Sequence, residues 1–300
     1  MMEYTGKKVT IMACSKCNIN CAHCYISYKG NRTAPELLEM VKKLSKRYKI
    51  EINGAEILTE PAYLDAFEVV GQDFIMTNGL ALYQDKDMLA FLKHHNIKKI
   101  FMSYHYGIQD DISVVSREQL ESNIMRIVKE GFKLRLYTTI TSSNYRMLHE
   151  MIEASKQYGA YSIRFTNYMR QGNALEMSDD NVMSDEQIKE FFEILAKERS
   201  QNDIHDFKIT RCGTFGNGCS QNFRCEAGID NVVLTPDNKV YPCIFLAKPG
   251  YEIGYYDGEK IMLFETPKND TKDCVARLIC NTDDKEAFER NFKPSEYNEA

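Results

Sequence analysis

The sequence has no long hydrophobic run, no excess of basic residues and no low-complexity segment. Its 300 residues include 38 Lys and Arg against 43 Asp and Glu, a formal net charge of −5. No chain-wide basic surface is available to hold a phosphate backbone, so nucleic acid is excluded as the expected partner. No window reaches the roughly 18 consecutive apolar residues that span a bilayer, and residues 1–8 lack the apolar stretch of a secretory signal. We therefore expect a cytoplasmic protein without a membrane partner.

Cysteine is absent from residues 25–211 and concentrated on either side of them. Ten cysteines are unusual in a reducing compartment, where disulfides are not the normal use of thiols. The N-terminal group consists of Cys14, Cys17, Cys21 and Cys24. The C-terminal group consists of Cys212, Cys219, Cys225, Cys243, Cys274 and Cys280. This distribution predicts two separate thiolate-rich sites.

The cysteine-free stretch alternates β-rich runs with amphipathic helical patterns, which is typical of βα units around a parallel sheet. Strands are predicted at 8–12, 51–57, 73–77, 98–104, 133–140 and 161–166. Helices are predicted at 34–48, 62–70, 86–95, 117–130, 145–158 and 185–199, with N-caps at Ser116, Asn144 and Ser184. Six units are too few for a closed eight-unit barrel. We therefore predict an α/β fold, a partial (β/α)6 TIM-like barrel over residues 1–203, with its active site at the carboxyl ends of the strands.

The alternation is expected to stop at about residue 203. A β-hairpin is predicted beyond it, with strands at 231–234 and 240–243 around a Thr-Pro-Asp-Asn turn. We assign residues 204–300 to a second, smaller domain built from this hairpin and helix.

Three of the N-terminal cysteines lie on the loop that follows the first predicted strand. Cys17, Cys21 and Cys24 form a C-x3-C-x2-C run. Three thiolates on one short loop can ligate three irons of a cubane 4Fe-4S cluster and leave the fourth iron open to a substrate. A structural zinc site with Cys14 as fourth ligand is the alternative, because zinc prefers four such ligands. The spacing favours the cluster, since paired zinc knuckles usually place a longer loop between their pairs.

The loop resembles the signature of the radical S-adenosylmethionine (radical SAM) superfamily, C-x3-C-x-aromatic-C, with His23 in the aromatic position. Further segments resemble the family's strand motifs in the family's order: Asn53-Gly-Ala-Glu56, Phe74-Ile-Met-Thr-Asn-Gly79, Ile100-Phe-Met-Ser103, Ile163-Arg-Phe and Arg170-Gln-Gly-Asn-Ala174. The resemblance implies that Glu56 accepts the methionine amino group of SAM, with Ala55 standing where the family has a glycine. It implies a set of cofactor contacts at Gly54, Ala55, Glu56, Asn78, Ser103, Arg117 and Arg164.

The resemblance also implies a reaction. The amino and carboxylate groups of SAM would bind the open iron, which brings its sulfonium next to the cluster. Electron transfer from a reductant such as flavodoxin or ferredoxin would then cleave SAM, and the 5′-deoxyadenosyl radical would abstract hydrogen from a substrate.

The C-terminal cysteines resemble the SPASM and twitch extensions of this superfamily, which carry auxiliary iron–sulfur clusters. The resemblance rests on Cys219-x5-Cys225-x17-Cys243 around the predicted hairpin. The extensions place a glycine five residues before the hairpin cysteine, where this chain has Asn238, which a left-handed turn tolerates. The resemblance implies one auxiliary 4Fe-4S cluster, with Cys274 or Cys280 as the fourth ligand. Zinc held by the same thiolates is the alternative.

Relatives with such extensions act on ribosomally made peptides or on small molecules. We expect a peptide-modifying oxidoreductase that forms a cross-link, a thioether or a D-residue, and in an epimerase Cys212 would return a hydrogen atom to the substrate radical. A dehydrogenase for an aminocyclitol or sugar-like alcohol is the alternative. A zinc-binding scaffold without enzymatic activity is a more remote one.

Overall fold

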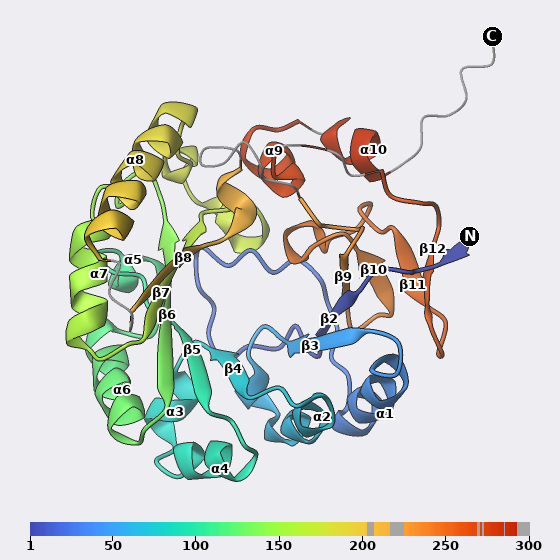
Figure 1. The fold of residues 1–300 in the computed structure, drawn as a ribbon, viewed down its shortest axis with the longest axis horizontal. Helices are drawn as coiled ribbons and strands as arrows, with labels where there is room; N and C mark the ends of the chain where they lie inside the picture. The colour runs from blue at the N-terminus through green and yellow to red at the C-terminus, as the bar shows by residue number, and fades with distance from the viewer. Residues whose placement is uncertain (203–206, 217–224, 269–270, 272, 285, 293–300) are drawn as a thin grey trace. The chain divides into compact units, whose positions relative to one another are not determined.

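The computed structural model describes residues 1–202, 207–216, 225–268, 271, 273–284 and 286–292. The chain packs as two units whose sequences interleave. The first unit comprises Met1–Cys17, Tyr25–Gln72 and Ser220–Ala300, and the second comprises Asn18–Cys24 and Asp73–Cys219. Each unit is built around one β-sheet (Figure 1). The predicted boundary between residues 203 and 204 stays a prediction.

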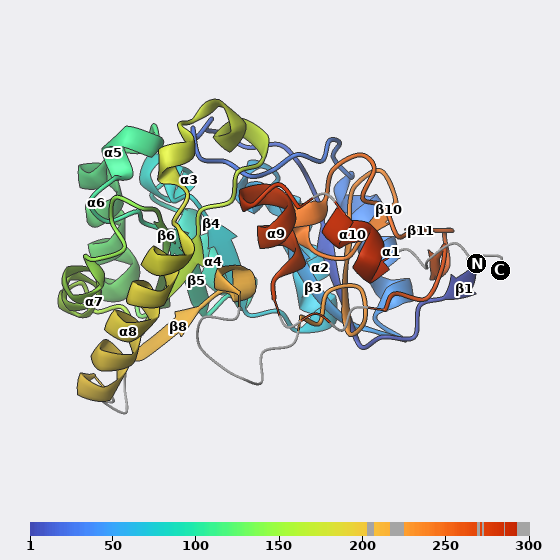
Figure 2. The same cartoon turned by 90° about the horizontal axis from the view of Figure 1, so that it is seen from above.

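The second unit contains a five-stranded parallel sheet whose strands follow the chain order. Its strands are β4 (Phe74–Thr77), β5 (Lys99–Ser103), β6 (Lys133–Ile140), β7 (Ser162–Asn167) and β8 (Lys208–Arg211). Its helices are α3 (Leu80–Gln84), α4 (Met88–His94), α5 (Gln109–Ile112), α6 (Arg117–Lys129), α7 (Leu148–Gln157) and α8 (Asp185–Gln201). The longer helices lie along one face of the sheet (Figures 1 and 2). Because the strands are parallel, all their carboxyl ends meet at one edge.

Local sequence explains most of this unit. Every second residue of β6 is buried, as a strand with one face on a core requires. Ser116 and Ser184 are N-caps with complete capping boxes, which confirms both predictions. Asn144 is not an N-cap, because α7 begins only at Leu148 and the Asn144 carboxamide oxygen instead accepts the Thr141 N–H at 2.9 Å.

The first unit contains a seven-stranded mixed sheet in the order β1-β12-β11-β10-β9-β2-β3. Its strands are β1 (Met2–Glu3), β2 (Lys8–Met12), β3 (Lys49–Asn53), β9 (Asn231–Leu234), β10 (Lys239–Tyr241), β11 (Gly254–Tyr256) and β12 (Ile261–Leu263). Its helices are α1 (Ala34–Leu44), α2 (Leu64–Val70), α9 (Val275–Asn281) and α10 (Glu286–Phe292). The predicted hairpin is confirmed as β9 and β10.

Two features of the sheets differ from expectation. The strand β9 pairs in parallel with β2, so the hairpin joins the sheet of the first βα unit. The alternation does not stop at residue 203, because β8 adds a further parallel strand beside β7. The sequence of β8 is Lys-Ile-Thr-Arg, in which a single strongly apolar residue gives too little pattern to identify a strand.

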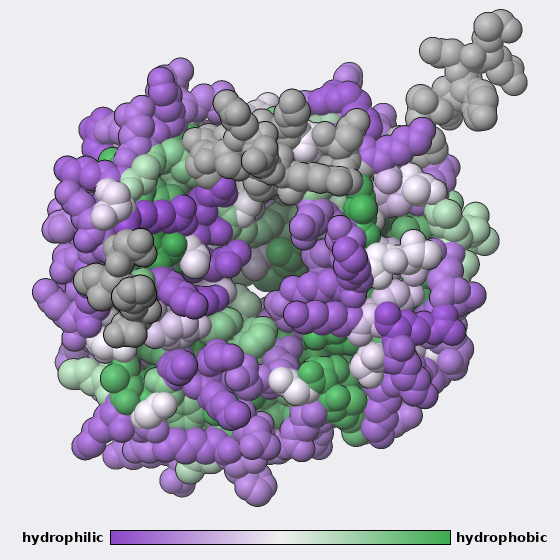
Figure 3. Space-filling model, viewed as in Figure 1, coloured by the Kyte–Doolittle hydropathy of each residue, from purple (hydrophilic) through white to green (hydrophobic). Residues whose placement is uncertain are grey.

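The face shown in Figure 3 is largely hydrophilic, with apolar residues in small separate groups. Within the described part of the chain, no helix has the length and apolar character needed to cross a bilayer.

Candidate active site

Residues 18–24 of the cysteine loop belong to the second unit and contact segments that follow its parallel strands. The Ala22 N–H donates to the carbonyl oxygen of Ile112 at 3.1 Å, at the end of α5. The Cys21 Sγ lies 3.7 Å from the Ser113 Oγ. The loop therefore lies at the carboxyl edge of the sheet, where parallel α/β folds place their active sites.

The three thiols of the signature are accessible to differing degrees. Cys17, which ends the first stretch of the first unit, is exposed, and Cys21 and Cys24 are half-buried. In the described residues, no group of three or more Cys, His, Asp or Glu side chains is already arranged as a metal site. Three soft thiolate donors on one accessible loop nevertheless suit the ligand chemistry of an iron–sulfur cluster.

His23, between Cys21 and Cys24, packs against His105 of the same unit. Their rings meet edge to face with centroids 4.5 Å apart. The Thr139 N–H donates to the His105 Nδ1 at 3.1 Å, so this ring carries its proton on Nε2. Burial lowers the pKa of both histidines, more than the hydrogen bond to the Ile112 carbonyl raises that of His23, and the His23 ring lowers the pKa of His105 further. The pair is therefore neutral at pH 7 and adds no positive charge beside the cysteines.

The predicted SAM-binding segment Gly54-Ala55-Glu56 follows β3 in the first unit. The Ala55 N–H donates to the Cys14 carbonyl oxygen at 3.0 Å, and the Glu56 N–H donates to that of Lys16 at 3.2 Å. A Cβ built on Gly54 would lie 2.7 Å from the Cys14 Sγ, so this position has room only for glycine. The segment therefore braces the residues that lead into Cys17.

The carboxylate of Glu56 is fully buried. Its Oε1 accepts the Leu58 N–H at 3.1 Å and caps a short 3-10 turn, Ile57–Thr59. The structure thus shows a capping role for Glu56, and its contact with the SAM amino group stays a prediction.

The remaining predicted cofactor contacts lie in the second unit, and their roles stay predictions. Asn78 follows β4, where its Oδ1 accepts the Leu80 N–H at 2.9 Å at the start of α3. Ser103 is half-buried at the end of β5. Arg117 is the first residue of α6, and its guanidinium forms an ion pair with the Glu121 carboxylate at 2.6 Å. Arg164, on β7, lies over the ring of Tyr137.

The proposed hydrogen donor Cys212 is half-buried and directly follows β8. Its N–H donates to the Phe165 carbonyl oxygen at 2.8 Å, which continues the pairing of β8 with β7. Its role also stays a prediction.

Four cysteines of the C-terminal group belong to the first unit, and three of them act electrostatically on the fourth, Cys243. Cys225 precedes β9, Cys243 follows β10, and Cys274 and Cys280 are buried at the start and near the end of α9. Burial raises the pKa of the Cys243 thiol well above its usual value, and the thiols of Cys274, Cys225 and Cys280 raise it further. The structure therefore brings both late cysteines near Cys243, where the sequence left a choice between them. Cys219 lies outside the described residues.

The β9–β10 turn explains the asparagine at the position where the related extensions have glycine. Asn238 has a left-handed backbone with φ of 65°, as predicted. Its Oδ1 also accepts a hydrogen bond from the guanidinium of Arg32 at 2.9 Å, a bond that glycine could not make. Arg32 is buried, and burial lowers its pKa to about 10. Sequence analysis missed Arg32, because nothing in the local pattern around it indicates a distant partner.

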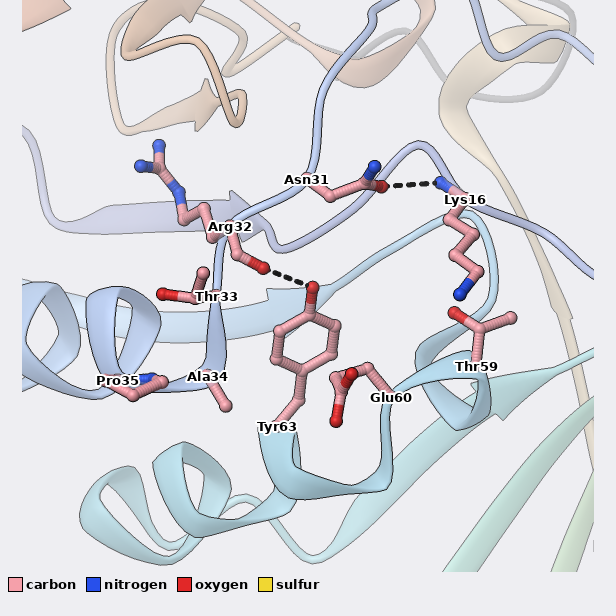
Figure 4. Close-up of a pocket in the computed structure, with 9 residues that line it drawn as sticks. All are labelled: Lys16, Asn31, Arg32, Thr33, Ala34, Pro35, Thr59, Glu60 and Tyr63. Carbon is pink, nitrogen blue, oxygen red and sulfur yellow. Dashed lines mark hydrogen bonds between the residues drawn. The ribbon is translucent and has the colours of Figure 1, made fainter.

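A cavity of about 400 Å³ in the first unit adjoins the residue before Cys17 (Figure 4). It is lined by Lys16, Asn31, Arg32, Thr33, Ala34, Pro35, Thr59, Glu60 and Tyr63. The Lys16 N–H donates to the Asn31 Oδ1 at 3.0 Å, and the Tyr63 hydroxyl donates to the Arg32 carbonyl oxygen at 2.6 Å. The first of these bonds ties the chain before the cysteine loop to the chain after it. Sequence analysis gave no sign of this cavity.

Comparisons with known proteins give relatives for most of the chain, although no protein-family profile matches it. The GTP 3',8-cyclase of Aquifex aeolicus is 24% identical over 269 residues, which cover 81% of this chain and 83% of the relative. The subtilosin biosynthesis protein AlbA of Bacillus subtilis is 23% identical over 252 residues, which cover 78% of this chain and 54% of AlbA.

Solved structures share the fold. SuiB of Streptococcus suis bound to precursor peptide SuiA has a TM-score of 0.67 at 13% identity, covering 83% of this chain and 62% of SuiB. The protein anSMEcpe with bound AdoMet has a TM-score of 0.67 at 17% identity, covering 96% of this chain and 88% of the other. The chain thus spans less than two thirds of AlbA and of SuiB. The predicted α/β partial-barrel fold class is confirmed, and the comparisons support the predicted resemblance to the radical SAM superfamily.

Proposed function

We propose that this chain is a radical SAM enzyme that modifies a ribosomally synthesised peptide. The observation that carries the proposal is the C-x3-C-x2-C loop, whose residues 18–24 lie at the carboxyl edge of a parallel sheet. When bound, a 4Fe-4S cluster with an open iron and SAM would supply a 5′-deoxyadenosyl radical that abstracts hydrogen from the substrate. Cys17, Cys21 and Cys24 would hold the cluster.

The protein itself would position the cofactors and shield the radical from water. His23 of the loop packs against His105, and burial lowers the pKa of both rings, which disfavours a positive charge there. Gly54, Ala55 and Glu56 brace the residues before Cys17, and together with Asn78, Ser103, Arg117 and Arg164 they are the proposed contacts of SAM. Excluding water and competing hydrogen donors directs a reactive radical to one presented C–H bond.

The comparisons support a peptide as substrate. AlbA is named for the biosynthesis of a bacteriocin, SuiB is solved with its precursor peptide, and anSMEcpe is solved with AdoMet and a peptide. The GTP 3',8-cyclase shows that a relative of this chain also acts on a small molecule. Epimerisation, cross-linking and thioether formation are the proposed reactions, with Cys212 as the hydrogen donor in an epimerase.

We further propose one auxiliary 4Fe-4S cluster in the first unit. The thiols of Cys225, Cys274 and Cys280 each act electrostatically on the Cys243 thiol, and Cys219 is a further candidate from the sequence. Four thiolates match the ligand number of such a cluster. A cytoplasmic flavodoxin or ferredoxin is the proposed electron donor.

The test is anaerobic. Reconstituted, dithionite-reduced protein is incubated with SAM, with and without candidate precursor peptides, and 5′-deoxyadenosine is quantified beside a Cys17→Ala, Cys21→Ala, Cys24→Ala variant. We expect product from the wild type only, and a peptide mass change in the presence of its substrate. An iron-loaded wild type that gives no 5′-deoxyadenosine with any peptide would overturn the proposal, and a colourless zinc protein would favour the scaffold alternative.

A further inference from the structure

The two asparagines between Cys17 and Cys21 each pair with another asparagine of the second unit. The Asn78 Nδ2 donates to the Asn18 Oδ1 at 2.8 Å. The Asn173 Nδ2 donates to the Asn20 Oδ1 at 2.7 Å and to the Cys21 carbonyl oxygen at 3.0 Å. A carboxamide nitrogen carries two hydrogens, so Asn173 can serve both acceptors at once.

Both anchoring asparagines come from segments whose own geometry is fixed. The Asn78 Oδ1 accepts the Leu80 N–H at the start of α3, which leaves its nitrogen pointing at the loop. Asn173 lies in a 3-10 turn, Gly172–Glu176, that follows β7. The carbonyl oxygen of Ile112, after β5, accepts the Ala22 N–H and lies 3.3 Å from the His23 Nδ1. The loop is therefore held at three points along the carboxyl edge of one sheet.

We propose that Asn173, with Asn78, is a positioning residue that holds residues 18–24 in their ligand-bearing conformation before any cluster binds. The proposal rests on the cluster assigned to this loop under the proposed function. Ordering a loop of this length costs conformational entropy. If the loop is already ordered before the cluster binds, that cost does not reduce the free energy of metal binding.

The chemistry of the anchors suits this role. Carboxamides are neutral, so they fix the backbone without forming ion pairs with the thiolates that a cluster needs. A Lys or Arg at the same place would pair with those thiolates. The anchors bind the Asn18 and Asn20 side chains and the Cys21 carbonyl oxygen, and leave the sulfur atoms themselves to the metal.

The first test uses metal-free protein and measures amide hydrogen exchange at Ala22 and Cys24 under anaerobic conditions. Asn173→Ala removes both bonds of the anchor, and we expect exchange at these amides to be about tenfold faster. The matched control is Asn181→Ala, which loses one bond of the same kind, from its Nδ2 to the Ser178 carbonyl oxygen at 2.9 Å, with no contact to the loop. Unchanged exchange in Asn173→Ala would overturn the proposal.

A second variant separates hydrogen bonding from packing. Asn173→Asp keeps the shape of the side chain but replaces the donor by an oxygen that faces two acceptor oxygens. We expect it to raise exchange at Ala22 at least as much as Asn173→Ala. An Asn173→Asp variant that behaves like the wild type would overturn a donor role for this residue.

The third measurement follows iron release to a chelator from reconstituted protein. In Asn173→Ala we expect release from the loop cluster to be about tenfold faster, while release from the second cysteine group and the thermal denaturation midpoint stay as in Asn181→Ala. Equal release from the two variants would contradict the proposal. If the wild type binds iron but makes no 5′-deoxyadenosine, the proposed function fails while the exchange result stands, so the two failures are distinguishable.

Discussion

The two cysteine regions of this chain are built in opposite ways. The N-terminal loop places three thiols within eight residues of polar, accessible chain, held by side-chain carboxamides. The C-terminal group draws its thiols from a much longer stretch, residues 212–280, and two of them, Cys274 and Cys280, are buried. The first arrangement suits a metal centre that must meet a substrate, and the second suits a closed centre. The comparison teaches that thiol spacing identifies an open site, whereas a closed site depends on tertiary packing.

The largest expected effect is a difference between the two cysteine regions in how much the loss of one cysteine lowers the free energy of unfolding. Cys243→Ala should lower the free energy of unfolding of the iron-loaded protein by about 4 kcal/mol, because short strands and helices surround this group and metal binding contributes to their folding. Cys24→Ala should change it by less than about 1 kcal/mol, since it lies on a half-buried polar loop. Each variant should lose roughly half of the iron.

Denaturant unfolding and iron analysis of both variants check this prediction, with Cys212→Ala as the control expected to keep all its iron. Equal losses of stability in Cys24→Ala and Cys243→Ala would remove the distinction between the two regions.

The next effect concerns Gly54, in the segment that contacts the residues preceding Cys17. Gly54→Ala places a Cβ 2.7 Å from the Cys14 Sγ and should destabilise the protein by about 2 kcal/mol. Removing the sulfur should relieve this clash, so the Gly54→Ala, Cys14→Ala double variant should be more stable than Gly54→Ala alone. A double-mutant cycle by urea denaturation measures the coupling. If the two changes in stability are additive, the Gly54→Ala Cβ does not clash with the Cys14 sulfur, and the prediction is wrong.

An effect of similar size is expected at the hairpin of the C-terminal group, and it can be divided into two smaller parts. Asn238→Ala forces a residue with a Cβ into the left-handed region and also removes the bond to Arg32, with an expected loss of about 2 kcal/mol. Asn238→Gly removes only the bond and should lose about 1 kcal/mol. Thermal denaturation of the two variants gives the order, and a glycine variant as unstable as the alanine variant would mean that the turn conformation is not the deciding factor.

Sequence alone identified the features that depend on local spacing. The ends of β2 and β6 and the caps Ser116 and Ser184 follow from neighbouring residues, and the structure confirms them. Features that depend on residues distant in the sequence could not be predicted. The parallel pairing of β2 with β9 joins residues more than 200 positions apart.

The same limit applies within the candidate site. The bonds of Arg32 to Asn238 and of Asn173 to Asn20 link single polar residues whose local sequence has no distinguishing pattern. The choice between Cys274 and Cys280 could not be made from spacing, because it depends on where α9 packs.

The smallest expected effect concerns the pH dependence of stability in the second unit. It comes from Glu121 and does not involve the cysteines. Burial opposes ionisation of Glu121, but hydrogen bonds from Tyr158, Arg117 and Tyr104 outweigh it and lower the pKa of this carboxyl group. A carboxyl group with a lowered folded-state pKa contributes stability above its ordinary pKa of about 4.3, and that contribution is lost as the pH falls through the folded-state value. Glu121→Gln should therefore be about 1 kcal/mol less stable than the wild type at pH 7, and the gap should close between pH 5 and pH 3. Urea unfolding of both proteins across this range measures the gap, and a gap of constant size would show that the Glu121 charge does not contribute.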